Sequence, residues 1–328
     1  MRFTLDTEQR QFADSLHQLL SDSDVPTVAR AWAAEDTSPG LGLWKQLAEL
    51  GVTALAVPER AAGLGAHPVD LVVAFEQLGR HAVPGPVVES IAAVPTLLAQ
   101  LGDLERLAAL AEGELLAGMV APPHVPLALD ADVTGILVAV NPGDGSVGVA
   151  EGTVEGPLRS LDPARRLFRL GPIRPMATDV PDAVNRAFDF GVLACAAQLV
   201  GAGTGLLEQA VAYAGQREQF GRPIGSFQSV AHQLADVHVG LELARPLLYG
   251  AAVALDSRSA TAGRDVSAAK VAAGTAAHRA ARTALQVHGA IGYTLEHDLS
   301  LSLTKVRALI GTWGTPAVHR AKVREALR

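Results

Sequence analysis

The sequence predicts a mostly α-helical protein made of an N-terminal helical domain, a small central β domain and a C-terminal four-helix bundle. Apolar residues make up 49% of the 328 residues but aromatic residues only 4%, which favours packed helices over a large sheet. The length is enough for two or three domains. Short apolar runs with turn residues are confined to the middle third, and long Ala-rich stretches follow Asp182. We therefore expect domains over residues 1–113, 114–176 and 177–328.

The first domain shows helical periodicity and helix start signals. Asp6 followed by Gln9 forms a capping-box pattern before a run of apolar residues at helical spacing. Further helices are expected around Trp44 and from about Pro68 to Arg80, where Pro84-Gly85-Pro86 breaks the chain. One more helix and an Ala/Leu-rich segment then lead to Gly113.

The middle segment has the pattern of short strands. From about Leu115 to Leu170, brief apolar runs are separated by Pro122-Pro123, by the turn Asn141 to Gly145 and by Gly152. This pattern predicts a small β domain.

The last domain is predicted as four long helices. It has few helix breakers, the clearest being Gly221 to Gly225 and Gly289 to Gly292. Its first helix contains an uncharged run, Phe190 to Leu207, that is long enough to span a membrane. Gln198 and several glycines within the run favour a buried helix of the bundle and no membrane span.

Composition excludes some classes of function. A net charge of −7 argues against nucleic-acid binding, which requires a basic face. The single cysteine, Cys195, cannot form a disulfide within the chain, and no secretion signal follows Met1. We expect a cytoplasmic protein in which Cys195 is buried and structural. His232 and His238 are six residues apart, which does not suit two ligands on one helical face, so no metal site is predicted.

Two glycine-containing turns carry the strongest functional pattern. One is the segment from Arg217 to Gln228, REQFGRPIGSFQ, and the other is the segment from Gln286 to Tyr293, QVHGAIGY. Taken alone, each is no more than a loop between helices. Glycine at such turns lets the backbone approach a flat or phosphorylated ligand closely.

Together the two turns closely resemble the acyl-CoA dehydrogenases, which carry Arg-x-x-Phe-Gly-x-x-(Ile/Leu)-x-x-x-Gln and Gln-x-x-Gly-Gly-x-Gly at this spacing. The N-terminal third agrees in Val57-Pro58-Glu59, Gly63-Leu64-Gly65 and Phe75 to Arg80. The resemblance covers nearly the whole chain and is weakest in the middle. It implies an FAD-dependent oxidoreductase that acts on an acyl-CoA thioester.

The resemblance also assigns cofactor contacts. It implies that FAD lies between the β domain and the bundle, with its adenine half held by a neighbouring subunit. Arg217 would pair with the pyrophosphate, for which a planar guanidinium is well suited. Further contacts are implied for Phe220, Gln228, Gln286, Gly289, Ala290 and Thr315, although Ala290 stands where the family usually has a second glycine.

The same alignment finds no catalytic base. In the family a glutamate removes a proton α to the thioester, either from Tyr-Glu-Gly-Thr near the C-terminus or from the first bundle helix. These positions correspond to Trp313 and Gly191, and Val192 replaces the neighbouring substrate-side arginine. Glu296 is the fallback candidate, although the family also has a glutamate there in a structural role. The Thr-Glu-Pro segment beside the flavin also has no match, and Met119 to Pro122 stands in its place.

Three hypotheses follow from this pattern. We favour a subunit that works with another acyl-CoA dehydrogenase subunit supplying the glutamate, in a dimer or tetramer. The second hypothesis is a homo-oligomeric dehydrogenase with an unorthodox base. The third is a flavin-free structural homologue, against which Arg217 and Gln228 argue.

Overall fold

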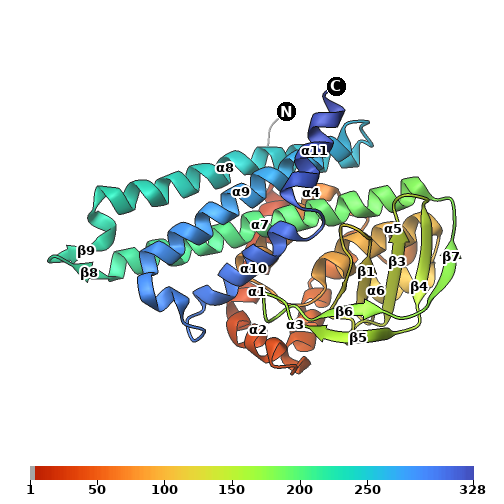
Figure 1. Ribbon diagram of the computed structural model, residues 1–328, viewed down its shortest axis with the longest axis horizontal. Helices are drawn as coiled ribbons and strands as arrows, with labels where there is room; N and C mark the ends of the chain where they lie inside the picture. Colours follow the sequence, from red (N-terminus) through yellow and green to blue (C-terminus); the bar gives the residue numbers. More distant parts are fainter. Residues whose placement is uncertain (1–3) are drawn as a thin grey trace.

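The computed structural model describes residues 4–328, and it has the three-part helical architecture that the sequence predicts (Figure 1). The N-terminal helices are α1 (Thr7–Asp22), α2 (Val25–Ala33), α3 (Ser38–Glu49), α4 (Pro68–Arg80), α5 (Val94–Leu101) and α6 (Leu104–Ala111). The predicted capping box is present, because the Asp6 side chain accepts from the Gln9 amide at 2.8 Å and the Gln9 side chain accepts from the Asp6 amide at 3.2 Å.

The β domain consists of two small sheets. Its strands are β1 (Ala117–Val120), β2 (Ala128–Leu129), β3 (Ile136–Asn141), β4 (Ser146–Ala150), β5 (Thr153–Leu158), β6 (Leu167–Leu170) and β7 (Ile173–Ala177). One sheet has the order β1-β3-β4-β7, in which only β1 and β3 are parallel, and the other has the antiparallel order β2-β6-β5. Val120 and Leu137 from the first sheet pack with Ala128 and Phe168 from the second, so a minor core joins the two sheets.

The C-terminal bundle is formed by α7 (Pro181–Gln216), α8 (Gln228–Asp256), α9 (Ala262–His288) and α10 (Leu299–Gly311), followed by α11 (Pro316–Ala326). A short hairpin of β8 (Glu218–Gln219) and β9 (Arg222–Pro223) joins α7 to α8 and projects from one end of the bundle (Figure 1). Helix α7 runs through the centre of the molecule. It packs on α4 from the N-terminal domain and on α9 from the bundle.

Glycines allow α4 and α7 to approach each other closely. A Cβ atom on Gly201 would lie 1.9 Å from the Glu76 carbonyl oxygen, and one on Gly79 would lie 2.2 Å from the Gln198 carbonyl oxygen. Within residues 4–328, α7 is the one helix long and apolar enough to cross a membrane, and 89% of its most apolar window is buried. This burial confirms the prediction of a buried bundle helix over Phe190 to Leu207.

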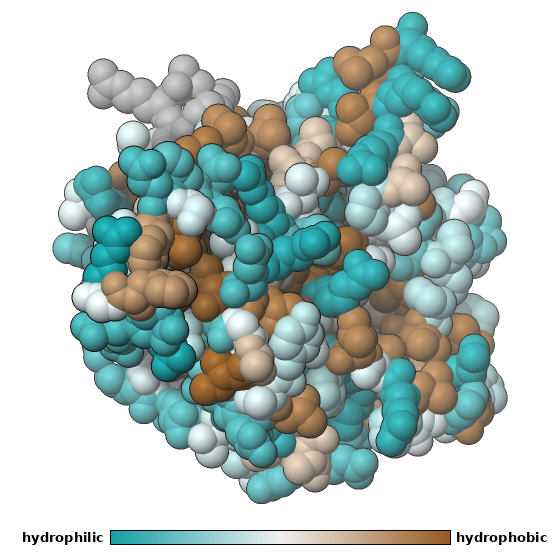
Figure 2. Space-filling view, turned by 60° about the vertical axis from the view of Figure 1, so that its left-hand side comes forward, coloured by the Kyte–Doolittle hydropathy of each residue, from teal (hydrophilic) through white to brown (hydrophobic). Residues whose placement is uncertain are grey.

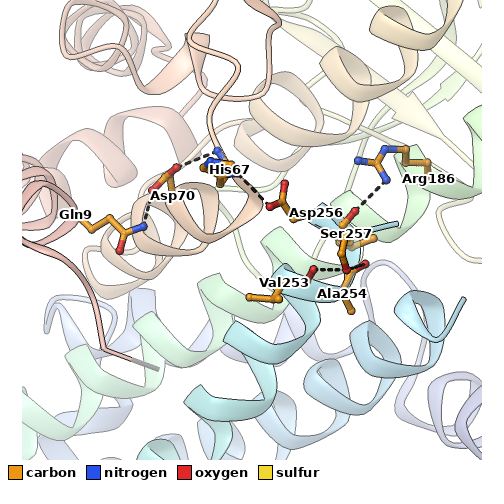
Figure 3. Close-up of polar contacts among 9 residues, drawn as sticks. Gln9, His67, Asp70, Arg186, Val253, Ala254, Asp256 and Ser257 are labelled. Atoms are coloured by element: carbon orange, nitrogen blue, oxygen red, sulfur yellow. Dashed lines mark hydrogen bonds and ion pairs between the residues drawn. The ribbon is translucent and has the colours of Figure 1, made fainter. Parts of the chain in front are cut away.

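Polar side chains tie the N-terminal domain to the bundle near the end of α8 (Figure 3). Asp70 accepts from the Gln9 side chain at 2.8 Å and from the His67 amide at 2.9 Å. The His67 ring then lies 3.1 Å from Asp256, and this hydrogen bond raises the pKa of His67. On the other side of the same turn, Arg186 donates to the Leu255 carbonyl oxygen at 3.2 Å.

Candidate active site and cofactor contacts

Trp313 lies in the turn between α10 and α11, and its side chain is completely buried. Its backbone φ is +59° and that of Gly314 is +97°. A bulky residue in this left-handed region is strained, and strain of this kind is held in place only by the surrounding structure. The chain thus has a tight turn at the position where the resemblance implies a catalytic glutamate.

His319 holds the turn from the α11 side. Its Nε2 atom lies 2.9 Å from the Trp313 carbonyl oxygen and its Nδ1 atom lies 3.1 Å from the Ser267 hydroxyl. A carbonyl oxygen can only accept, so Nε2 carries the proton and Nδ1 accepts from Ser267. Burial lowers the pKa of His319 to about 4, which keeps this neutral form in place at neutral pH.

Lys270 and Cys195 contact backbone carbonyl groups at the C-terminal end of α10. The buried Lys270 ammonium donates to the carbonyl oxygens of Leu309 at 2.9 Å and Ile310 at 3.3 Å, a favourable place for a cation at a helix C-terminus. Cys195 is completely buried, with its Sγ atom 3.5 Å from the Leu309 carbonyl oxygen. Burial raises the pKa of the Cys195 thiol. Both residues therefore position the turn at Trp313.

The two predicted base positions touch each other. A Cβ atom on Gly191 would lie 2.3 Å from the Trp313 ring, so the indole fills the space that any side chain at 191 would need. The Phe188 ring lies 5.6 Å from the indole, centroid to centroid, and Val192 beside it is buried. Neither position offers a carboxylate, and the Phe188 and Val192 side chains beside them are apolar.

A buried carboxyl group, Glu89, lies beside Trp313 and was missed in the sequence. It begins a π-helical turn, Glu89–Ala93, and is only 2% exposed. Its Oε2 atom has no hydrogen-bond partner among the residues that the structure describes, and neither has the Trp313 Nε1 atom. Burial raises the pKa of Glu89 more than the opposing effects of Arg165 and the Trp313 indole lower it. One signal in the sequence was available, because Glu89 interrupts an otherwise apolar run.

A cavity of about 430 Å³ lies next to this carboxyl, between the β domain and the end of α10. Its apolar walls come from the segment around β2, the loop before β6, and α10. Its charged and polar lining residues are Glu89, His124, Ser160, Arg165, Arg307 and Thr312. The cavity lies where the family resemblance implies the flavin ring, between the β domain and the bundle.

Most of the predicted cofactor contacts lie at the C-terminal end of α7, far from the predicted base positions. Arg217 follows the last residue of α7, and Gln286 lies near the end of α9. These two helix ends are in contact, because the Tyr213 and His288 rings stack with their centroids 4.4 Å apart. Gln228 begins α8 at the same end, and Gly289 and Ala290 follow α9. Gly191 lies 26 residues before Arg217 on the same helix, or about 39 Å away at 1.5 Å per residue. Within one chain, the predicted pyrophosphate contact is therefore far from the predicted base positions.

The Arg217 end presents exposed polar groups that a ligand can reach. Arg217, Gln228 and Gln286 are exposed, and within residues 4–328 Arg217 forms no ion pair. Gly289 has a φ of +63° with nothing within 4 Å of a Cβ atom, so a ligand can approach its backbone. Phe220 is 93% exposed at the tip of the β8–β9 hairpin. Figure 2 brings this side forward and shows hydrophobic residues in separate patches among hydrophilic ones.

The remaining two candidates lie apart from this group. Thr315 is on the Trp313 side, where its hydroxyl caps α11 by accepting from the Val318 amide at 3.4 Å. Glu296 is exposed in the loop before α10, at the opposite end of that helix from Trp313. Among the described residues, no cluster of three metal-ligating side chains occurs.

This fold, with a helical N-terminal domain and a small β domain packed against a four-helix bundle, is that of the acyl-CoA dehydrogenases. Residues 6–108 match the family described as "Acyl-CoA dehydrogenase, N-terminal domain", and residues 182–328 match the family described as "Acyl-CoA dehydrogenase, C-terminal domain". The chain belongs to the acyl-CoA dehydrogenase family and is an oxidoreductase of that family.

Similar proteins cover most of the chain. Acyl-CoA dehydrogenase IpdE2 of Mycobacterium tuberculosis is 32% identical over 298 residues, covering 90% of this chain and 89% of the relative. IpdE2 of Mycolicibacterium smegmatis is 30% identical over 311 residues, covering 94% and 95%.

Solved structures share the fold. A steroid acyl-CoA dehydrogenase, the Tcur3481–Tcur3483 G363A variant, aligns with a TM-score of 0.86 at 23% identity, covering 99% of this chain and 98% of that one. The ChsE4–ChsE5 complex of Mycobacterium tuberculosis aligns with a TM-score of 0.83 at 21% identity, covering 100% and 99%. PigA with FAD and proline aligns with a TM-score of 0.85 at 19% identity, covering 100% and 99%.

Proposed function

We propose that this chain is the base-free subunit of a heteromeric acyl-CoA dehydrogenase and contributes the exposed Arg217 end of its bundle to a flavin held mainly by the partner subunit. The observation that carries the proposal is the contact between Trp313 and Gly191. Both positions that supply the base in this family meet in one place, and an indole ring fills it. A general base must lie within hydrogen-bond reach of the α-proton, and neither of these two positions has a carboxylate to serve as that base.

The cofactor contacts support the partner's flavin as the target. FAD, when bound, accepts the β-hydride of the acyl group. Arg217 would hold the pyrophosphate, and Gln286 with the Gly289 and Ala290 backbone would hold the adenine. These groups are exposed at the far end of α7 from Trp313, which supports a flavin shared between two chains. IpdE2 is an acyl-CoA dehydrogenase, and the structurally similar ChsE4–ChsE5 complex is named as an assembly of two different chains.

Exposed apolar side chains support an assembly. Val239, Leu243 and Leu247 are 54%, 68% and 48% exposed, and they follow one another at four-residue spacing along α8. Such a stripe on a soluble protein marks a contact surface.

The experiment is the flavin spectrum of the complex. The chain is co-expressed with an acyl-CoA dehydrogenase homologue that carries the catalytic glutamate, and bound FAD is measured after gel filtration. Arg217→Ala should weaken FAD retention by about one to two decades, because a charge-assisted contact contributes roughly 1.5–3 kcal/mol. Arg169→Ala, which removes an exposed arginine of the β domain, is the matched control. Equal retention in the two variants would refute the role of Arg217.

A second candidate function is a homo-oligomeric dehydrogenase with an unorthodox base. The position of Glu89 favours it, since this buried carboxyl lies beside Trp313 while Glu296 lies at the other end of α10. The two functions differ in one respect: only the second lets the unpartnered chain turn over its substrate.

A further inference from the structure

The cavity beside Trp313 contains hydrogen-bonding groups that the protein leaves unused. The Glu89 side chain is only 2% exposed, yet its Oε2 atom has no hydrogen-bond partner in residues 4–328. Buried polar groups almost always have a partner, so an exception calls for a ligand or a functional explanation. The Trp313 indole Nε1 atom beside it is a second exception.

Arg165 adds a positive charge to the same cavity. Its Nη2 atom donates to the Thr312 hydroxyl at 3.4 Å, the single hydrogen bond that its side chain makes within the described chain. A guanidinium has five N–H donors, so most of them remain available. Arg165 is close enough to Glu89 to lower the pKa of that carboxyl, but among the described residues no ion pair joins the two side chains.

We propose that this cavity binds an apolar molecule bearing one carboxylate, which is held between the guanidinium of Arg165 and the carboxyl of Glu89. Burial raises the pKa of Glu89, which favours its protonated form as a hydrogen-bond donor. The protonated carboxyl of Glu89 and the guanidinium of Arg165 can both donate to one ligand carboxylate. Such charge-assisted hydrogen bonds are stronger than hydrogen bonds between neutral groups.

The apolar walls and the volume of the cavity determine which kind of ligand body fits beside the carboxylate. Leu127, Leu129, Leu161 and Leu167 line the cavity, so they favour a compact apolar body over a heavily hydrated one. A cavity of about 430 Å³ is within the range of small-molecule sites. His124 also lines it, and burial lowers the pKa of that imidazole, so it adds no charge at neutral pH. This site goes beyond the proposed function, because the Arg217 end lies at the other end of α7.

The test is calorimetric titration of the purified full-length chain with two rigid probes. Adamantane-1-carboxylate carries an apolar cage and one carboxylate, and adamantane-1-carboxamide is its uncharged counterpart. We expect the carboxylate to bind at least about tenfold more tightly than the carboxamide. Arg165→Met should reduce carboxylate affinity by about 10–100-fold and leave carboxamide affinity nearly unchanged, as expected for the loss of one charge-assisted contact. Arg169→Met, on exposed β6, is the control.

Glu89 has its own pair of variants. Glu89→Gln keeps a hydrogen-bond donor and should retain carboxylate binding, whereas Glu89→Leu removes the donor and should reduce affinity about tenfold. Arg165→Lys keeps the charge without the planar guanidinium, and its carboxylate affinity should be lower than that of wild type, which tests the proposal even if Arg165→Met fails to fold.

Three results would overturn the proposal. Equal binding of the two probes would show that the carboxylate is not recognised. Unchanged affinity in a folded Arg165→Met variant would remove Arg165 from the site. Displacement of the probe by micromolar FMN would identify the cavity as a flavin-ring pocket of this chain. Each of these results is independent of FAD retention in the heteromeric complex, which tests the proposed function.

Discussion

At the scale of single residues, Gly191 and Trp313 form a matched pair. An added methyl group at 191 would lie 2.3 Å from the indole, and overpacking of a buried site costs about 1–3 kcal/mol. We therefore expect Gly191→Ala to lower the free energy of unfolding by about 1–2 kcal/mol in urea titrations, after allowing for the better helix propensity of Ala. Trp313→Phe in the same chain should recover part of the loss.

Gly240 provides the matched control. It also lies inside a bundle helix, α8, but a Cβ atom there would have nothing within 4 Å. Gly240→Ala should therefore stabilise the protein by up to about 1 kcal/mol. If Gly191→Ala behaved like Gly240→Ala, the indole would not fill the base position as described.

At the scale of elements, the turn between α10 and α11 depends on a neutral His319. The ordinary pKa of histidine is 6.5 and burial lowers that of His319 to about 4. The unfolded chain therefore binds more protons between these values. The contribution of His319 to stability is fully present above pH 6.5 and is lost as the pH falls to about 4.

The measurement is urea unfolding of wild type and His319→Gln between pH 7 and pH 4. The stability advantage of wild type over the variant should shrink by about 3 kcal/mol over this interval, since each pKa unit corresponds to about 1.4 kcal/mol. His232→Gln, at an exposed position on α8, controls for the substitution itself. A constant difference between wild type and His319→Gln would contradict the assignment.

The same scale shows what the sequence could predict. Helix α4 has the bounds expected from its periodicity, Pro68–Arg80, because a proline begins it and its apolar face repeats at helical spacing. The small β domain was predicted as a region, but its strand order was not. Strand pairing joins segments distant in sequence, such as the parallel β1 and β3, and local patterns carry no information about it.

The candidate site was predicted in part, for a similar reason. Motif spacing identified Trp313, Gly191 and Arg217, since each has a fixed place in a recognisable pattern. It did not show that Gly191 and Trp313 are in contact, which depends on how α7 and α10 pack. Glu89 escaped notice because it lies in no motif, and its burial beside Trp313 arises only in the folded chain. The domain boundaries at residues 113 and 176 and the individual cofactor contacts remain predictions.

At the scale of the whole molecule, the exposed stripe on α8 predicts an oligomer. Sedimentation at micromolar concentration should give a dimer or tetramer, with or without the partner chain, and not a 34.0 kDa monomer. Leu243→Arg places a charge in the middle of the stripe and should weaken association at least tenfold. Val154→Arg, at an exposed site of the β domain, should leave association unchanged. A monomeric wild type would remove the argument for a shared flavin.

The last prediction concerns turnover and separates the two functions. With Trp313 and Gly191 at the base positions, the isolated chain reconstituted with FAD should bleach little flavin when given saturated acyl-CoA thioesters. The loss of a positioned general base slows a reaction by roughly 10²–10⁴-fold, so trace activity is expected but efficient turnover is not. The complex with the partner should turn over, and a glutamate-to-glutamine change at the partner's base should abolish that activity. Glu89→Gln and Glu296→Gln in this chain should leave the activity of the complex largely unchanged. Rapid bleaching by the unpartnered wild-type chain, abolished by either of these two variants, would instead establish a homo-oligomeric enzyme and identify its base.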